Sequence, residues 1–234
     1  MPIPKLPIVV LISGSGSNLQ AIIDAVARGE LDAEIRAVIS NRPDAQGLQR
    51  ARAAGIPTEV LDHTDFASRA DYDAALQERI DRYSPQLVVL AGFMRLLTDD
   101  FVNHYLGRLI NIHPSLLPDF KGLDTHARAL AAFRAGEISE HGASVHFVTP
   151  ALDDGPVILQ AHVPIRDHDT AERLAARVLL QEHRIYPAAI GWFAAGRLQL
   201  SPSPAQSNTQ QILLDGKPLL QPLRFDANTA GEQP

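Results

Sequence analysis

Short apolar runs alternate along the first half of the chain with segments whose apolar residues recur every three or four positions. The apolar runs predict buried strands at Ile8–Ser13, Ile35–Ser40, Thr58–Leu61, Leu87–Ala91 and Leu109–His113. The helical spacing predicts helices at Asn18–Arg28, Gly47–Ala54, Asp71–Tyr83 and Asp99–Tyr105. This strand–helix rhythm predicts an α/β fold with a doubly wound, mostly parallel sheet and helices on both faces.

The second half has a different pattern. Helices are expected at Thr125–Ala135 and Thr170–Ile185, and strands at Ala143–Val148, Pro156–Val163, Leu198–Leu200 and Gln211–Leu214. The polar stretch Ser201–Gln210 joins the last two strands, and Asp215-Gly216 predicts a hairpin turn. We expect the residues from about Asp226 to Pro234 to be disordered. The predicted organisation is one domain over residues 1–200, followed by a small C-terminal hairpin and tail over residues 201–234.

Composition narrows the function classes. A chain of 234 residues with 45% hydrophobic residues is suited to one α/β domain with a sizeable core. It contains no Cys, which excludes thiolate nucleophiles, disulfides and Cys-ligated metals. A formal net charge of -6 disfavours a nucleic-acid partner. No segment has the ~20 apolar residues of a membrane span, and no cleavable signal precedes the first strand, so we expect a cytoplasmic protein without a membrane partner.

A glycine-containing junction follows the first strand. The sequence Ser13-Gly14-Ser15-Gly16-Ser17-Asn18 lets the backbone approach a ligand, and the helix after it favours an anion at its N-terminus. We expect Ser17 and Asn18 to cap this helix, and a tight turn with a cap is the alternative interpretation. A dinucleotide fingerprint is disfavoured, because the third glycine is missing and Asn41-Arg42 ends the second strand where an acid would be needed. A monophosphate site at this junction fits better than a dinucleotide site.

A polar pair lies at the end of the fifth predicted strand. Asn111 and His113 are two residues apart and therefore point to one face, and Pro114 places them at the carboxyl end of the strand. Asn can donate to a developing oxyanion, and His can transfer a proton near neutral pH. A structural role for a lone His is the alternative. The later motif Leu152–Pro156, taken alone, reads as an ordinary turn.

An acidic residue lies on an apolar helix face. Glu182 follows Val178 by four residues and shares its stripe, so it needs either a ligand or a salt-bridge partner. Metal binding is not expected, because the nine His form no H-E-x-x-H motif. The G-x-S-x-G elbow of a serine nucleophile is absent as well.

These motifs together resemble the folate-dependent formyltransferases, and within them the enzymes that act on glycinamide ribonucleotide. The resemblance is carried by five stretches between about Ile8 and Leu200. They are VVLISGSGSNLQAII at Val9–Ile23, VVLAGFMRLL at Val88–Leu97, INIHPSLLP at Ile110–Pro118, GASVHFV at Gly142–Val148 and LDDGPVILQ at Leu152–Gln160. The resemblance implies a formyltransferase-like fold and transfer of a formyl group from 10-formyltetrahydrofolate, as co-substrate, to the amine of glycinamide ribonucleotide in de novo purine synthesis.

The resemblance also implies catalytic and binding roles for particular residues. It implies a catalytic trio of Asn111, His113 and Asp153, supported by His146, in which the charge of Asp153 favours the imidazolium of His113. Substrate would be held by its phosphate at Gly16, Ser17 and Asn18 and by its ribose at Glu182. The folate would be bound by residues from three segments and the trio: Arg69, Met94, Arg95, Leu96, Leu97, Asn111, Thr149 and Asp153. Leu179 departs from the family, whose relatives carry a polar or basic residue there.

Three other functions share some of these features. Methionyl-tRNA formyltransferase would add a C-terminal RNA-binding domain, for which about 34 residues after Leu200 leave no room. Formyltetrahydrofolate hydrolase would add an N-terminal regulatory domain ahead of the first strand. A non-catalytic phosphate-binding module would have no use for Asn111 and His113. We expect the protein to act as a monomer or weak homodimer.

Overall fold

The computed structural model describes residues 5–202 and 210–226. The linker Ser201–Gln210 is therefore described only at its ends. Residues 227–234, which form nearly all of the tail expected to be disordered, lie outside the described residues.

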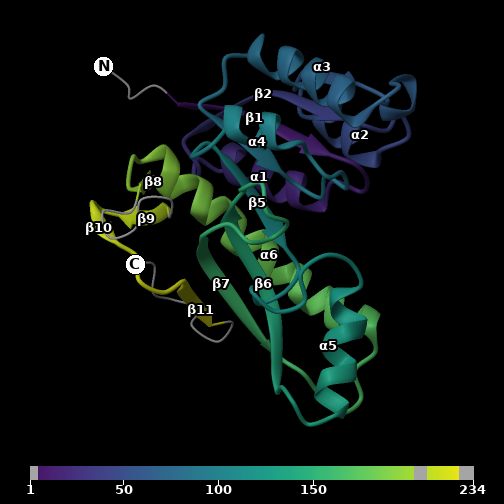
Figure 1. Cartoon of the computed structure of the whole chain (residues 1–234), viewed down its shortest axis with the longest axis vertical. Coiled ribbons are helices and arrows are strands. Elements are labelled where there is room, and N and C mark those ends of the chain that lie inside the picture. The colour runs from purple at the N-terminus through teal and green to yellow at the C-terminus, as the bar shows by residue number, and fades with distance from the viewer. Residues whose placement is uncertain (1–4, 203–209, 227–234) are drawn as a thin grey trace.

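Strands and helices alternate along most of the chain (Figure 1). The strands are β1 Leu6–Ile12, β2 Ala33–Ser40, β3 Thr58–Val60, β4 Leu87–Leu90, β5 Leu109–His113, β6 Glu140–Phe147, β7 Val157–Pro164, β8 Leu198–Pro202, β9 Gln210–Leu214, β10 Lys217–Pro218 and β11 Leu223–Asp226. The helices are α1 Ser17–Ala27, α2 Gln46–Ala53, α3 Arg69–Asp81, α4 Asp99–His104, α5 Thr125–Arg134 and α6 Ala171–Ala194, with a 3-10 turn η1 at His63–Asp65.

Eight strands form the main sheet, in the order β11-β7-β6-β5-β4-β1-β2-β3. Only β6 runs against its neighbours, so the sheet is mostly parallel, as predicted. The chain leaves β1 towards β2 on one side and later returns to β4 on the other. The carboxyl end of β1 is therefore a topological switch point, which is where open α/β sheets bind ligands.

Helices cover both faces of this sheet. All seven residues of β1 are buried, which is typical of a parallel strand covered on both faces. Its even-numbered side chains, such as Ile8 and Val10, pack with α1, α2 and α6, whereas Val9 and Leu11 pack with α3 and α4. The prediction of a doubly wound sheet is confirmed.

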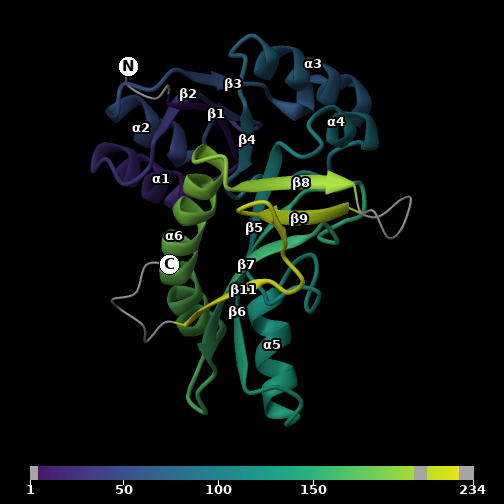
Figure 2. The ribbon, with the colours of Figure 1, turned by 90° about the vertical axis from the view of Figure 1, so that its left-hand side faces the viewer.

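Helix α6 is longer than the sequence indicated. The predicted helix ends at Ile185, but α6 continues through Pro187 to Ala194 along one face of the sheet (Figure 2). Pro187 removes one backbone donor, yet the following turns bury Ala189 and Ile190 in the core, and this burial outweighs the loss. The hydroxyl of Tyr186 donates to the carbonyls of Leu90, at 2.9 Å, and Ile110, at 3.1 Å, and so holds β4 and β5 together.

The C-terminal strands divide between two sheets. Strands β8, β9 and β10 form a small antiparallel sheet, and its Asp215-Gly216 turn has positive φ at both residues, as a type I′ hairpin requires. Strand β11 was not predicted. It pairs in parallel with β7 and extends the main sheet, and the Arg184 guanidinium of α6 lies 4.7 Å from the centre of the Phe225 ring. Among the described residues, no helix combines the length and apolar character needed to cross a membrane.

Candidate active site

The two faces of β5 and β6 differ sharply in polarity. Ile110 and Ile112 point into the core beneath α6, as do the alternate residues of β6. The opposite face presents Asn111 and His113 from β5, and His146 lies directly across from Asn111 in the antiparallel register. The shared face predicted for Asn111 and His113 is confirmed, and the pair lies at the carboxyl end of a central strand.

His146 orients the amide of Asn111. Burial lowers the pKa of His146 to about 4, so the imidazole is neutral near pH 7. Its Nδ1 donates to the carbonyl oxygen of Phe147 at 2.9 Å, which leaves Nε2 as an acceptor for Asn111 Nδ2 at 3.2 Å. The second N–H of Asn111 remains available to another acceptor. A neutral ring also means that the 3.9 Å approach of Asp153 to His146 Nε2 is not an ion pair.

Asp153 reaches His113 from the loop between β6 and β7. The distance from its Oδ2 to His113 Nδ1 is 3.4 Å, and the same oxygen accepts a hydrogen bond from Gly122 N at 2.9 Å. Asp153 itself has φ of +47°, a left-handed conformation that Asp tolerates better than most residues. The loop closes tightly because a Cβ at Gly155 would lie 1.8 Å from the carbonyl oxygen of Phe147, so only glycine fits there.

His113 lies between two acceptors. Its Nε2 is 3.1 Å from the carbonyl oxygen of Phe120, and its Nδ1 faces Asp153. The side chain is only 7% exposed, so water screens the carboxylate's effect weakly. These contacts place the His113 ring beside Asn111, with the Asp153 carboxylate facing its Nδ1.

The glycine junction begins α1 without a side-chain cap. The N-cap residue is Gly16, at φ of +69°, and no side chain bonds to the first turn, so the prediction that Ser17 and Asn18 cap the helix is wrong. Ser17 and Asn18 both lie within the first turn, because the helix begins one residue earlier than a Ser17 cap would require. Gly16 is the N-cap residue and adopts the left-handed conformation that non-glycine residues avoid. The first backbone N–H groups of α1 therefore lack an internal partner, which makes this end suited to an anion.

Glu182 lies next to this junction. It is 7% exposed, and its Oε2 accepts a hydrogen bond from Asn18 Nδ2 at 2.6 Å. Burial raises the pKa of Glu182, and the Asn18 hydrogen bond opposes that rise. Among the described residues no basic side chain forms an ion pair with Glu182, so its partner is the amide of Asn18. The link joins α6 to the start of α1 across 164 positions of sequence.

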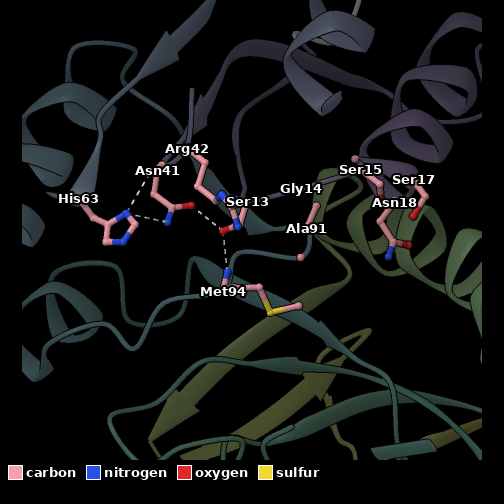
Figure 3. Close-up of a pocket in the computed structure, with 12 residues that line it drawn as sticks. Ser13, Gly14, Ser15, Ser17, Asn18, Asn41, Arg42, His63, Ala91 and Met94 are labelled. Carbon is pink, nitrogen blue, oxygen red and sulfur yellow. Dashed lines mark hydrogen bonds between the residues drawn. The ribbon is translucent and has the colours of Figure 1, made fainter. Parts of the chain in front are cut away.

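A cavity of about 420 Å³ opens at the carboxyl ends of β1, β2 and β4. Residues Ser13 to Asn18 line one part of it (Figure 3). The other part is lined by Asn41, Arg42 and His63. The sequence pattern did not predict a site at these three residues. Ser13 Oγ donates to Asn41 Oδ1 at 2.6 Å and accepts from Met94 N at 2.7 Å, while Asn41 Nδ2 lies 3.3 Å from His63 Nδ1.

The position of two of these residues, just after predicted strands, could have indicated this part of the cavity from the sequence. Asn41 follows β2 directly, and His63 follows β3 after a short loop, so both are at the sheet edge where β1 ends. The predicted catalytic trio of Asn111, His113 and Asp153 does not line this cavity. It lies two strands away from β1, on β5 and its neighbouring loop.

The residues expected to bind folate come from separate segments. Met94 and Leu96 follow β4 and are 72% and 56% exposed, which is unusual for large apolar side chains. Arg95 lies over the Tyr72 ring at 5.0 Å, and its buried Nε has no partner. Leu97 packs against the core beneath α3 and α4, and Thr149 is half-buried at the start of the Asp153 loop.

Arg69 is placed differently. It is exposed at the first position of α3, near Asp73. The buried carboxylate of Asp73 in turn accepts from Thr98 N at 2.6 Å, directly after the Met94–Leu97 segment. Within the described part of the chain, no three His or acidic side chains gather closely enough to hold a metal ion.

Comparison with known proteins identifies the class. The family model described as Formyl transferase matches residues 6–190, and the chain belongs to that family. Phosphoribosylglycinamide formyltransferase of Escherichia coli is 56% identical over 205 residues, which cover 88% of this chain and 95% of that protein.

Two solved structures are similar throughout. A phosphoribosylglycinamide formyltransferase from Coxiella burnetii is 57% identical with a TM-score of 0.86, covering 94% of this chain and 99% of that one. A glycinamide ribonucleotide transformylase from Symbiobacterium toebii is 48% identical with a TM-score of 0.79, covering 83% of this chain and 90% of that one. The resemblance that the motifs indicated, and the fold that it implied, are confirmed.

Proposed function

We propose that this protein transfers the formyl group of 10-formyltetrahydrofolate to the amine of glycinamide ribonucleotide in purine synthesis. The products are N-formylglycinamide ribonucleotide and tetrahydrofolate. The observation that carries the proposal is the convergence of Asn111, His113 and Asp153 at the end of β5, with Asp153 Oδ2 only 3.4 Å from His113 Nδ1. The names of the relatives with 48–57% identity support the same reaction.

The ribonucleotide binds between the glycine junction and α6 in this proposal. Its phosphate accepts hydrogen bonds from the uncapped first turn of α1 at Gly16, Ser17 and Asn18. Its ribose hydroxyls donate to Glu182, whose carboxylate is already held by Asn18. These contacts direct the amine away from the junction and towards Asn111.

The folate binds over the apolar side chains that flank the trio. Met94, Leu96 and Leu152 are all more than half exposed and come from the two loops on either side of β5. A flat ring system would cover this surface, and the buried, unpartnered Nε of Arg95 offers a donor beside it. The residues present therefore fit a folate. When bound, the folate supplies an activated formyl group to the attacking amine.

The chain's own groups stabilise the charge that develops during transfer. As the amine nitrogen bonds to the formyl carbon, the carbonyl electron pair moves to oxygen. Asn111 Nδ2 donates to that oxygen, and the positive charge of His113 lies beside it. The Asp153 carboxylate faces His113 Nδ1, and it relays the proton released by the amine, through water, to the departing folate nitrogen. The carbon–nitrogen bond to the folate then breaks.

A spectrophotometric assay tests the reaction. The purified protein is mixed with glycinamide ribonucleotide and 10-formyl-5,8-dideazafolate, and release of the deformylated folate is followed. We expect release only when both substrates are present. Release without the ribonucleotide, together with free formate, would indicate a hydrolase instead. No release, with no binding of folate by titration calorimetry, would indicate a phosphate-binding module.

A further inference from the structure

The glycine junction is packed directly on the first turn of α2. Gly47 N donates to the Gly14 carbonyl at 3.0 Å. A Cβ built on Gly16 would lie 2.5 Å from Gly47 Cα, and one built on Gly47 would lie 3.1 Å from Gly16 Cα and 2.6 Å from Ile12 Cδ1. The backbones of Gly16 and Gly47 are in contact because neither residue has a side chain. The position of the glycine junction is therefore tied to that of α2.

Arg50, one turn further along α2, makes a second connection. Its Nε donates to the Ser15 carbonyl at 2.9 Å, and its Nη1 lies 3.4 Å from Gln20 Oε1 in α1. Its stem passes over the junction, since Arg50 Cδ would be 3.6 Å from a Cβ on Gly16. Together with Ser17, Arg50 also lines a second hollow of about 340 Å³ on the α1 side of the junction.

These contacts give two consecutive carbonyls of the junction hydrogen-bond donors from α2. The Gly14 oxygen is held by Gly47, and the Ser15 oxygen by Arg50. A carbonyl turned towards a phosphate would repel it, whereas carbonyls bound to α2 leave the neighbouring N–H groups free to face the anion. The guanidinium also adds a positive charge close to the N-terminus of α1.

We propose that Gly47 and Arg50 are positioning residues that set the enzyme's preference for a phosphorylated substrate. This inference rests on the proposed function, because it assumes that the junction binds the substrate phosphate. Neither residue touches the reacting atoms. Their effect is confined to the KM of the ribonucleotide.

The test compares two substrates in four proteins. Glycinamide ribonucleotide and its dephosphorylated ribonucleoside are assayed with the parent, Arg50→Ala, Arg50→Lys and Arg52→Ala. Arg52 is the matched control, because it lies on the same helix and its Nε points to Thr58 Oγ1 at 3.2 Å. Arg50→Ala should raise the KM for the ribonucleotide about tenfold, as expected for one lost charge-assisted hydrogen bond, and leave kcat nearly unchanged. Arg50→Lys should restore part of the loss.

Activity on the ribonucleoside distinguishes a loss of phosphate recognition from general damage to the enzyme. Its kcat/KM should be the same in the parent and in Arg50→Ala, so that the preference for phosphate falls. Equal losses for both substrates, or an unchanged ribonucleotide KM, would overturn the inference. Gly47→Ala provides an independent variant and should show the same selective loss. A parent that formylates neither substrate would refute the proposed function itself, whereas an active parent with an unaffected Arg50→Ala variant would refute only the role of Arg50.

Discussion

At the scale of single residues, the site depends on the contacts that orient Asn111 and His113 on one face of β5. His146 is held neutral by burial, which makes its Nε2 an acceptor for Asn111. His113 has the Phe120 carbonyl oxygen at Nε2 and the Asp153 carboxylate facing Nδ1. The sequence predicted the shared face of Asn111 and His113, because strand periodicity decides it. It could not predict the protonation of His146, because that depends on burial by residues distant in sequence.

Removing the Asn111 amide should slow formyl transfer strongly. Asn111→Ala deletes one donor to the developing oxyanion, which typically costs about 10²–10³ in kcat. Steady-state rates with both substrates measure the loss, and thermal unfolding checks that the fold is retained. Asn103→Ala, at an exposed position of α4, is the control. Near-parental turnover in Asn111→Ala would remove this residue from the mechanism.

Neutralising Asp153 should change the pH dependence of activity. Asp153→Asn removes the negative charge that favours the imidazolium of His113, so activity should decline at a lower pH than in the parent as pH rises. Turnover near neutrality should fall accordingly. The control is Asp154→Asn, which loses only an exposed ion pair with Lys121. If the pH–rate profiles of both variants match that of the parent, Asp153 is a turn residue and nothing more.

At the scale of elements, the local pattern predicted most of the chain and failed where long-range packing decides. The alternation of strands and helices up to His113 is visible in the sequence, because buried parallel strands are continuous apolar runs. The continuation of α6 past Pro187 depends on Ala189 and Ile190 meeting the core. The pairing of β11 with β7 joins segments about 60 positions apart, and no local signal indicates it. The contact between Gly16 and Gly47 is equally invisible in the sequence.

The start of α1 should tolerate no side chain at Gly16. Gly16→Val would place a branched residue at φ of +69° and within 2.5 Å of Gly47 Cα. We expect a higher KM for glycinamide ribonucleotide and an almost unchanged KM for the folate. Gly191→Ala, within α6 and with only an ordinary 3.8 Å contact, controls for loss of a glycine as such. Equal increases in both KM values would contradict a phosphate site at this junction.

At the scale of the whole molecule, buried histidines should make folding sensitive to acid. Burial, followed by the nearby charges of His126 and His113, lowers the pKa of His141 to about 4. Because this lies below the ordinary value of 6.5, the unfolded chain binds the proton first as the pH falls. The contribution of neutral His141 to stability is therefore complete above about pH 6.5 and is lost progressively as the pH falls towards 4.

Removing His141 should reduce this loss. Between pH 7 and pH 5 the parent should lose about 2 kcal/mol of unfolding free energy through His141 alone. Urea unfolding at the two pH values measures the difference, and His141→Gln should lose correspondingly less than the parent. Equal pH dependence in both proteins would mean that His141 titrates normally in the folded state.

The most direct test of the proposed reaction is identification of the product. The parent and Asn111→Ala are incubated with glycinamide ribonucleotide and 10-formyltetrahydrofolate, quenched over time and examined by mass spectrometry. We expect the ribonucleotide to gain one formyl group in the parent, and to do so about 10²–10³ times more slowly in the variant. An unmodified ribonucleotide in the parent, or equal rates in the two proteins, would contradict it.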